Sequence, residues 1–122
     1  MKKLSNEEKF IQWSNKIVEE YKPILGLNLC DFKLIKGKTT EYLEFGIHHP
    51  YLDNYIYYSD KVVEDFNNNS LTKWDIVHEL CHAITDRFYY VAIDRYIGKN
   101  ELEDARENLT DTISSIIRNL QK

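Results

Sequence analysis

The amino-acid sequence predicts one α+β domain, in which a small sheet packs on a helix and the elements follow the order α-β-β-β-α-α. The chain has 122 residues, which is enough for one hydrophobic core and too few for two, so we expect a single domain over residues 1–122. Hydrophobic residues make up 43% and charged residues 30%, the balance of a globular protein. Apolar residues recur at helical spacing near both ends and alternate with polar residues between residues 27 and 47.

The first predicted helix begins after Ser5. Ser5 and Glu8 have the spacing of a capping box, in which each side chain accepts a hydrogen bond from the other residue's backbone amide. Apolar residues follow at helical spacing: Phe10, Trp13, Ile17 and Tyr21. Pro23 and Gly26 predict the end of this helix.

Three strands are expected after the first helix. Residues 27–35 and 42–47 alternate between apolar and polar side chains, which is typical of half-buried strands. Because they follow one another closely, we expect these two strands to pair as a hairpin. The aromatic run within residues 54–59 predicts the third strand.

Two connections flank the third strand. Pro50 lacks an amide hydrogen and ends the second strand, directly after His48 and His49. Adjacent side chains of an extended chain point in opposite directions, so we expect these two histidines on the surface and not on one metal ion. Residues 60–69 are expected to form a short helix or an irregular connection.

The next helix is predicted to begin near Lys73. Thr72 and Asp75 have the spacing of a capping box, with Asp in place of the usual Glu. Leu71 and Ile76 have the spacing of a hydrophobic staple across the same helix start.

Two arcs divide the side chains of this helix at about 100° per residue. The apolar arc holds Trp74, Val77, Leu80, Cys81, Ile84 and Phe88. The neighbouring polar arc holds Asp75, His78, Glu79, His82 and Asp86. Cys81 therefore faces away from the histidines, and we expect a buried thiol and not a metal ligand.

The last helix is predicted to start with a capping box of Asn100 and Glu103. Apolar residues then mark an amphipathic helix to the end of the sequence: Leu102, Ala105, Leu109, Ile113, Ile116, Ile117 and Leu120.

The polar arc contains the motif His-Glu-x-x-His, formed by His78, Glu79 and His82. On a helix, this spacing places two imidazoles on one face, where both can reach one metal ion. Zinc binds imidazole nitrogen at roughly 2.0–2.1 Å and leaves one position for water in catalytic sites. Glu79 would take a proton from that water, so the motif predicts a catalytic zinc site.

Two histidines hold zinc weakly, so a third protein ligand is expected. No histidine follows His82, which leaves the carboxylates of the last helix: Glu103, Asp104, Glu107 and Asp111. Glu103 lies nearer the edge of the apolar arc of that helix than Glu107 does, as an inward-facing ligand would, but it is also the capping-box partner of Asn100. The residues alone do not decide which of these acids is the third ligand.

The segments 78–82 and 107–114 together resemble the small single-domain zincin metallopeptidases of phage and prophage genomes. In that family a glutamate on the helix after the motif completes a site of two histidines and one glutamate. It is followed by small or apolar residues at three, six and seven positions, here Thr110, Ile113 and Ser114. The resemblance implies a minimal zincin-like fold, a Zn²⁺ cofactor and Glu107 as the third ligand. Judged from the residues alone, Glu103 and Asp111 remain the alternatives.

The resemblance also implies how a polypeptide substrate binds. In such zincins the strand before the motif helix pairs with the substrate backbone, a position that Tyr55, Tyr57 and Tyr58 fit here. A tyrosine hydroxyl could also stabilise the oxyanion, with Tyr57, Tyr58 and Tyr89 as candidates.

Charge and cysteine content bear on the partners and the cellular compartment of the protein. The net charge is −4 and no run of Lys or Arg occurs, so we expect no strong nucleic-acid footprint. Two isolated cysteines, no signal sequence and no membrane-spanning run predict a reduced, cytoplasmic protein.

Two further readings of the motif remain open. A non-catalytic, zinc-holding module that binds a protein partner would keep the ligands and leave Glu79 idle. A structural zinc site would close the fourth position with a protein ligand such as Asp75 or Asp111.

Overall fold

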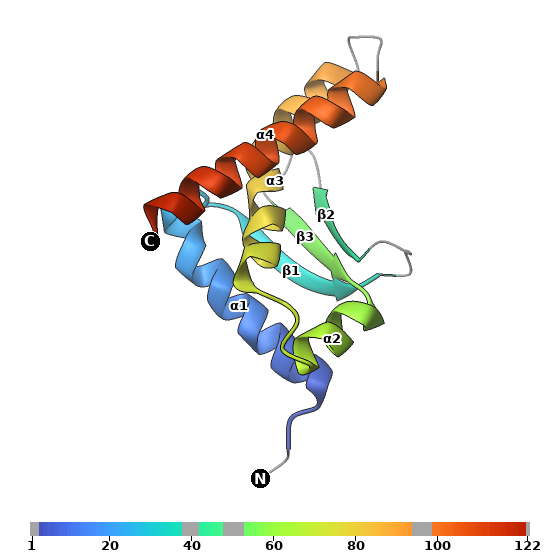
Figure 1. Ribbon diagram of the computed structural model, residues 1–122. Helices are drawn as coiled ribbons and strands as arrows, with labels where there is room; N and C mark the ends of the chain where they lie inside the picture. Colours follow the sequence, from blue (N-terminus) through green and yellow to red (C-terminus); the bar gives the residue numbers. More distant parts are fainter. Residues whose placement is uncertain (1–2, 38–41, 48–52, 94–98, 122) are drawn as a thin grey trace.

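A computed structural model describes residues 3–37, 42–47, 53–93 and 99–121, and at 87, 88, 90–93 and 99 it describes the backbone alone (Figure 1). His48 and His49 lie outside these residues, so their expected place on the surface stays a prediction. The elements are α1 (Asn6–Ile24), β1 (Asp31–Lys36), β2 (Leu43–Ile47), β3 (Asp53–Tyr58), α2 (Asp60–Asn67), α3 (Lys73–Ile93) and α4 (Lys99–Leu120).

The helices and strands form an α+β fold, as predicted, with one helix more than the predicted order. The additional helix is α2, in the segment expected as a short helix or an irregular connection. The Ser59 hydroxyl caps it by accepting a hydrogen bond from the amide of Val62 at 3.3 Å. None of the helices in the described part of the chain is long and apolar enough to cross a membrane.

The predicted capping box at the start of α1 is confirmed. The Ser5 hydroxyl accepts a hydrogen bond from the Glu8 amide at 3.1 Å, and the Glu8 carboxylate accepts one from the Ser5 amide at 3.2 Å. Pro23 lies in the last turn of α1, and Gly26 follows at φ +71°, a left-handed conformation that glycine adopts without a steric penalty. The helix therefore ends within the predicted segment.

The sheet has the strand order β1-β3-β2, and the predicted hairpin of the first two strands is wrong. β1 pairs in parallel with β3, and the antiparallel neighbours are β2 and β3. Alternation of apolar and polar residues is the same whichever strand lies alongside, so the sequence predicted the strands but not their partners. The third strand is central, and the first two lie at the edges.

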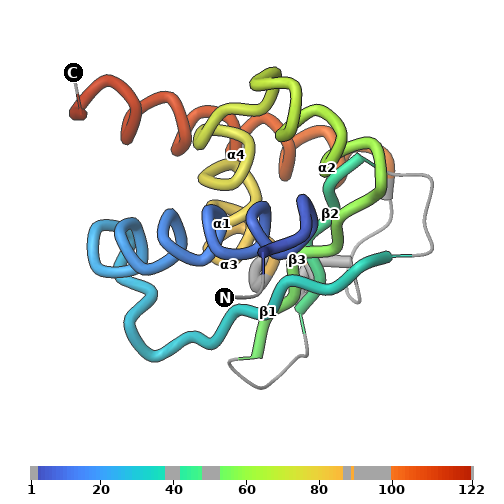
Figure 2. The backbone as a smooth tube through the Cα atoms, turned by 90° about the horizontal axis from the view of Figure 1, so that it is seen from below, coloured from blue at the N-terminus to red at the C-terminus, as the bar shows by residue number. Residues whose placement is uncertain are grey.

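One face of the sheet forms the core with α1 and α3. Along β3, Asn54, Ile56 and Tyr58 are buried on this face, while Tyr55 and Tyr57 lie on the other. Val77, Leu80 and Cys81 from the apolar arc of α3 pack here and are fully buried, which confirms Cys81 as a buried thiol. Figure 2 shows α4 and β1 on opposite sides of the molecule, with α1 and α3 between them.

The predicted orientation of the last helix is wrong in part. α4 already includes Asn100, so Asn100 is not its N-cap. Apolar positions on which the predicted inward face depended are exposed to solvent: Leu109 by 49%, Ile116 by 52% and Leu120 by 74%. Thr110 is instead fully buried. The inward face of the N-terminal half of α4 is polar because it packs against the polar arc of α3.

Candidate metal centre

The two motif histidines lie on one face of α3, near its start. The helix begins at Lys73, as predicted, and the Asp75 carboxylate accepts hydrogen bonds from the Thr72 amide at 2.9 Å and the Thr72 hydroxyl at 3.3 Å. His78 and His82 follow one turn apart, with ring centroids separated by 5.0 Å. His82 is buried, whereas the His78 side chain is 28% exposed.

Glu107 reaches both histidines from α4. Its Oε2 lies 3.6 Å from His78 Nε2 and its Oε1 lies 3.5 Å from His82 Nε2. One candidate ligand atom from each of the three residues can be chosen so that all lie within 4.8 Å of one another. α3 and α4 therefore bring two imidazole nitrogens and one carboxylate together.

The spacing of this cluster allows one metal ion to be held by all three residues. Tetrahedral ligands at roughly 2.1 Å from zinc stand roughly 3.4 Å apart. The two distances from Glu107 to the histidines, 3.5 and 3.6 Å, are close to that separation. Two imidazoles and one carboxylate are also a donor set that zinc accepts in catalytic sites. The three residues could therefore hold a metal ion, and their donor set is one that zinc accepts.

The other candidate acids have different neighbours. Glu103 accepts a hydrogen bond from the Tyr89 hydroxyl at 3.1 Å. Asp75 caps α3 through Thr72. Asp111 Oδ1 lies 3.0 Å from His78 Nδ1, the ring nitrogen that does not face Glu107. The sequence left four acids of the last helix as possible third ligands. Glu107 is the one that lies in the cluster with His78 and His82.

Carboxylates stand behind both imidazole rings. Asp86 Oδ1 is hydrogen-bonded to His82 Nδ1 at 3.0 Å and also accepts from the Thr85 hydroxyl at 3.3 Å. Asp111 has the corresponding place at His78. A carboxylate at Nδ1 favours the tautomer with its proton on that nitrogen, so that Nε2 remains available to a metal.

A buried hydrogen bond joins the two helices beside the cluster. The hydroxyls of Thr85 on α3 and Thr110 on α4 are 2.8 Å apart, and both residues are almost fully buried. Thr110 also donates to the Arg106 carbonyl at 2.8 Å. These contacts fix the position of α4 relative to α3 within one turn of Glu107.

Glu79 lies in the same cavity and is 7% exposed. Burial raises the pKa of Glu79 to about 7, opposed by His82 and assisted by the nearby charges of Glu107, Asp86 and Glu44. A carboxylate with a pKa near the working pH can both accept and release a proton, as a general base requires.

The pKa of His82 is the result of two opposed effects. Burial lowers it, but the hydrogen bond with Asp86 and the charges of Asp86, Glu79 and Glu107 raise it more, so that the net pKa is above the usual value. The surroundings of His82 thus favour a positive charge, whether a proton or a metal ion supplies it.

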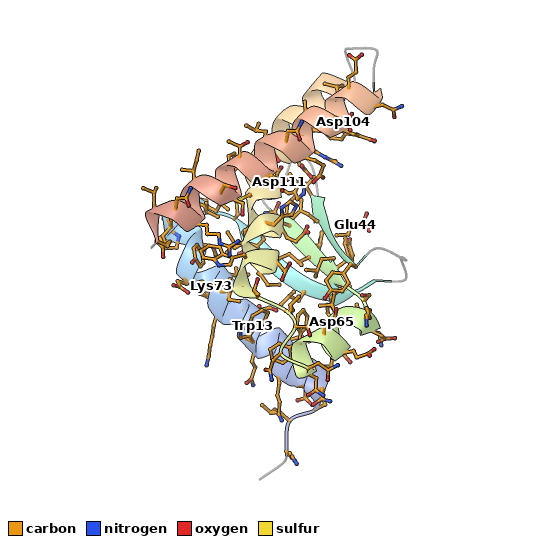
Figure 3. The ribbon with its side chains drawn as sticks, viewed as in Figure 1. Trp13, Glu44, Asp65, Lys73, Asp104 and Asp111 are labelled. Atoms are coloured by element: carbon orange, nitrogen blue, oxygen red, sulfur yellow. The ribbon has the colours of Figure 1, made fainter. Side chains whose placement is uncertain are left out.

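A cavity of about 440 Å³ opens beside the cluster, between α3, α4 and β2. The β2 residues Leu43, Glu44 and Phe45 form its wall opposite the helices. Figure 3 labels Glu44 on β2 and Asp111 where α4 passes α3. A neighbouring hollow of about 460 Å³ shares Leu43, His78 and Glu79 with this cavity, so the cleft extends past Leu43, between the start of α3 and α4.

The predicted substrate strand is wrong. β3, which carries Tyr55, Tyr57 and Tyr58, pairs with β1 on one edge and with β2 on the other, so its backbone has no edge for a substrate. None of the three tyrosines lines the metal cavity. Tyr58 is buried in the core and donates a hydrogen bond to Glu7 on α1.

Tyr89, the remaining tyrosine proposed for the oxyanion, lies behind the cavity wall. It is 8% exposed and donates to Glu103. Its hydroxyl is not among the groups that line the metal cavity.

Three features of the site were missed by sequence reasoning. Asp86 was placed on the polar arc but given no role, although its four-residue spacing from His82 was a usable signal. Arg106 lines the cavity beside Glu107, and no pattern in the sequence identified it. The cavity wall is β2, because the strand order differs from the expected one.

Comparison of the chain with protein-family models, with curated proteins and with solved structures finds no match. The geometry of the site and the resemblance of its motif are therefore the grounds for a functional proposal.

Proposed function

We propose that this protein is a zinc-dependent peptidase. The observation that carries the proposal is the meeting of His78, His82 and Glu107 at one side of a cavity that also contains Glu79. The resemblance of the motif segments to the small phage-type zincin metallopeptidases supports the same reaction class.

Each site residue has a role in the proposed reaction. His78, His82 and Glu107 hold the ion, and a bound zinc would polarise a peptide carbonyl and acidify a water molecule. Glu79 accepts a proton from the water as the water oxygen bonds to the carbonyl carbon of the substrate. The carbon–nitrogen bond then breaks, and Glu79 delivers that proton to the leaving amine.

The edge strand β2 is the proposed place for the substrate backbone. β2 pairs with β3 on one side, lies at the edge of the sheet, and forms a wall of the metal cavity. An extended peptide added to the edge of β2 that no described strand covers would make main-chain hydrogen bonds whatever its side chains. This strand takes over the role first expected of Tyr55–Tyr58.

A structural zinc site is less consistent with the geometry. It would need a fourth protein ligand, and the two acids considered for that place have other partners: Asp75 caps α3 and Asp111 lies at His78 Nδ1. An open cavity adjoins the cluster instead. A catalytic site needs such an open position.

Metal content tests the ligand set. Protein purified without chelator should contain about one zinc per chain, and His78→Ala should contain little. Glu107→Ala should lower zinc affinity far more than the matched variant Asp111→Ala, because only Glu107 contacts both Nε2 atoms. Equal zinc in the wild type and His78→Ala would refute the metal centre, and the reverse order of the two acids would reassign the third ligand.

Hydrolysis tests the role of Glu79. Zinc-loaded protein incubated with an unstructured protein such as casein should release peptides, detected by mass spectrometry. Glu79→Gln should bind zinc as the wild type does and lose about 10²- to 10⁴-fold in rate. A zinc-holding module that only binds a partner would instead release no peptides in either form, and Glu79→Gln would keep its biological effect.

A further inference from the structure

Arg106 is the one arginine or lysine among the described residues that line the metal cavity. It precedes Glu107 on α4, and its side chain is 23% exposed. Its guanidinium Nη2 lies 3.7 Å from Glu107 Oε1, and that same oxygen lies 3.5 Å from His82 Nε2. The guanidinium therefore borders the cluster of candidate ligand atoms.

An aromatic ring holds the guanidinium in place. The Arg106 Cζ atom lies 4.2 Å from the centroid of the Tyr89 ring, within the range of a cation–π contact. The Tyr89 hydroxyl is in turn hydrogen-bonded to Glu103, one turn before Arg106 on α4. The face of the guanidinium is thus occupied by the ring, and its edge, where the N–H groups lie, remains for polar partners.

The N–H groups of Arg106 are poorly used by the surrounding protein. Its nearest carboxylate oxygens are 3.9 Å from Nε, in Asp86, and 3.7 Å from Nη2, in Glu107, and both distances exceed that of a hydrogen bond. The buried Nε has no hydrogen-bond partner among the described residues. Leaving a charged donor buried and unsatisfied is unfavourable, so this geometry suits an additional anionic acceptor in the cavity.

We propose that Arg106 binds a negatively charged oxygen of the substrate beside the ligand cluster, namely the oxyanion that develops on the carbonyl under attack. This inference rests on the proposed peptidase function. It gives to Arg106 the role that the sequence suggested for a tyrosine. A positioned cation at the developing charge stabilises the transition state more than the ground state.

Phosphate binding tests the inference without a substrate. Inorganic phosphate, an oxyanion, is titrated by calorimetry into the full chain loaded with cobalt, for the wild type, Arg106→Gln and Arg106→Lys. We expect Arg106→Gln to weaken binding about 10- to 100-fold, as for the loss of a charge-assisted hydrogen bond. Arg106→Lys should fall between the two, because lysine keeps the charge but not the planar fork.

Arg118→Gln is the matched control, since it removes the same charge from the same helix. Arg118 lies twelve residues further along α4, about 18 Å away, beyond the screening length of about 8 Å at physiological salt. Arg118 lines the neighbouring hollow and not the metal cavity, and its guanidinium rests on Trp74, 5.3 Å from the ring centroid. Phosphate affinity should be unchanged in this variant. An equal loss in both variants would mean that general charge attracts the anion, and would overturn the inference.

Metal affinity separates anion binding from a structural role. If Arg106 only positioned Glu107 and Asp86, Arg106→Gln would weaken cobalt binding. If it binds the anion, cobalt binding should be unchanged or tighter, because a positive charge near the cation is removed. Weaker cobalt binding in Arg106→Gln, or phosphate affinity equal to the wild type, would overturn the inference.

Kinetics with a peptide substrate distinguish two anionic oxygens that Arg106 could bind: the oxyanion of the carbonyl under attack, and the terminal carboxylate of the substrate. Loss of oxyanion stabilisation should lower kcat about 10²- to 10³-fold with little change in KM. A KM effect that disappears when the peptide carboxylate is amidated would instead assign Arg106 to the substrate terminus, and would overturn the oxyanion role. If the wild type cleaves no peptide but phosphate binding depends on Arg106, the peptidase proposal fails while the anion site stands.

Discussion

Asp86→Asn should weaken zinc binding although Asp86 does not contact the ion site directly. The substitution keeps the shape of the side chain and an oxygen near His82 Nδ1, but it removes the negative charge behind the ring. That charge favours the tautomer and the electron density that His82 needs in order to bind a metal through Nε2. Asp111→Asn makes the same chemical change behind His78 and serves as the matched comparison.

Burial decides how large each effect should be. Both carboxylates lie 3.0 Å from an Nδ1 atom, but the Asp86 side chain is 4% exposed and that of Asp111 is 66% exposed. Losing a carboxylate behind a metal-bound imidazole weakens metal binding about 10- to 100-fold, which we expect for Asp86→Asn. Water screens the exposed contact between Asp111 and His78, which therefore contributes at most about 1 kcal/mol. We expect Asp111→Asn to lower zinc affinity by no more than about fivefold.

A competition titration with a chromophoric zinc chelator at neutral pH measures both affinities on one scale. Circular dichroism and thermal unfolding of the metal-free variants check that each retains the fold. The proposed role of Asp86 is refuted if both variants fold and Asp111→Asn loses as much zinc affinity as Asp86→Asn. It is refuted equally if Asp86→Asn binds zinc as tightly as the wild type.

Three further predictions concern the scaffold. Leu80→Ala should lower the free energy of unfolding in urea by about 2–5 kcal/mol, and Leu120→Ala, at a side chain 74% exposed, by far less; similar losses would contradict the packing. Ser5→Ala should lower it by about 1 kcal/mol through loss of the cap, and no change would argue against the capping box. Burial raises the pKa of the Cys81 thiol to about 12, so in a Cys30→Ser background iodoacetamide should label native protein very slowly at pH 8 and rapidly after unfolding; fast native labelling would contradict its burial.

Local signals in the sequence predicted the starts of α1 and α3. The capping residues at each start, Ser5 with Glu8 and Thr72 with Asp75, act within one turn, so their effect does not depend on the rest of the fold. The relation between His78 and His82 is equally local, since helical geometry alone sets it.

The partners of these elements could not be predicted in the same way. Strand alternation does not identify a neighbour, and β3 therefore took the central place where a hairpin of β1 and β2 was expected. In the N-terminal half of α4, apolar periodicity pointed Ala105 and Leu109 inward, but both are exposed, because Arg106, Glu107 and Thr110 pack against a polar surface there. Glu107 was indicated by the family resemblance, whereas the helical periodicity had favoured Glu103.

The strand order has a consequence for how the chain folds. β2 and β3 are consecutive in sequence and antiparallel in the sheet. Their pairing, which builds the wall of the cavity, therefore closes only a short loop of chain. β1 precedes both and must join β3 in parallel across a longer stretch of chain, which is the slower kind of contact to make. The half of the sheet nearest the histidines therefore has the quicker route to assembly.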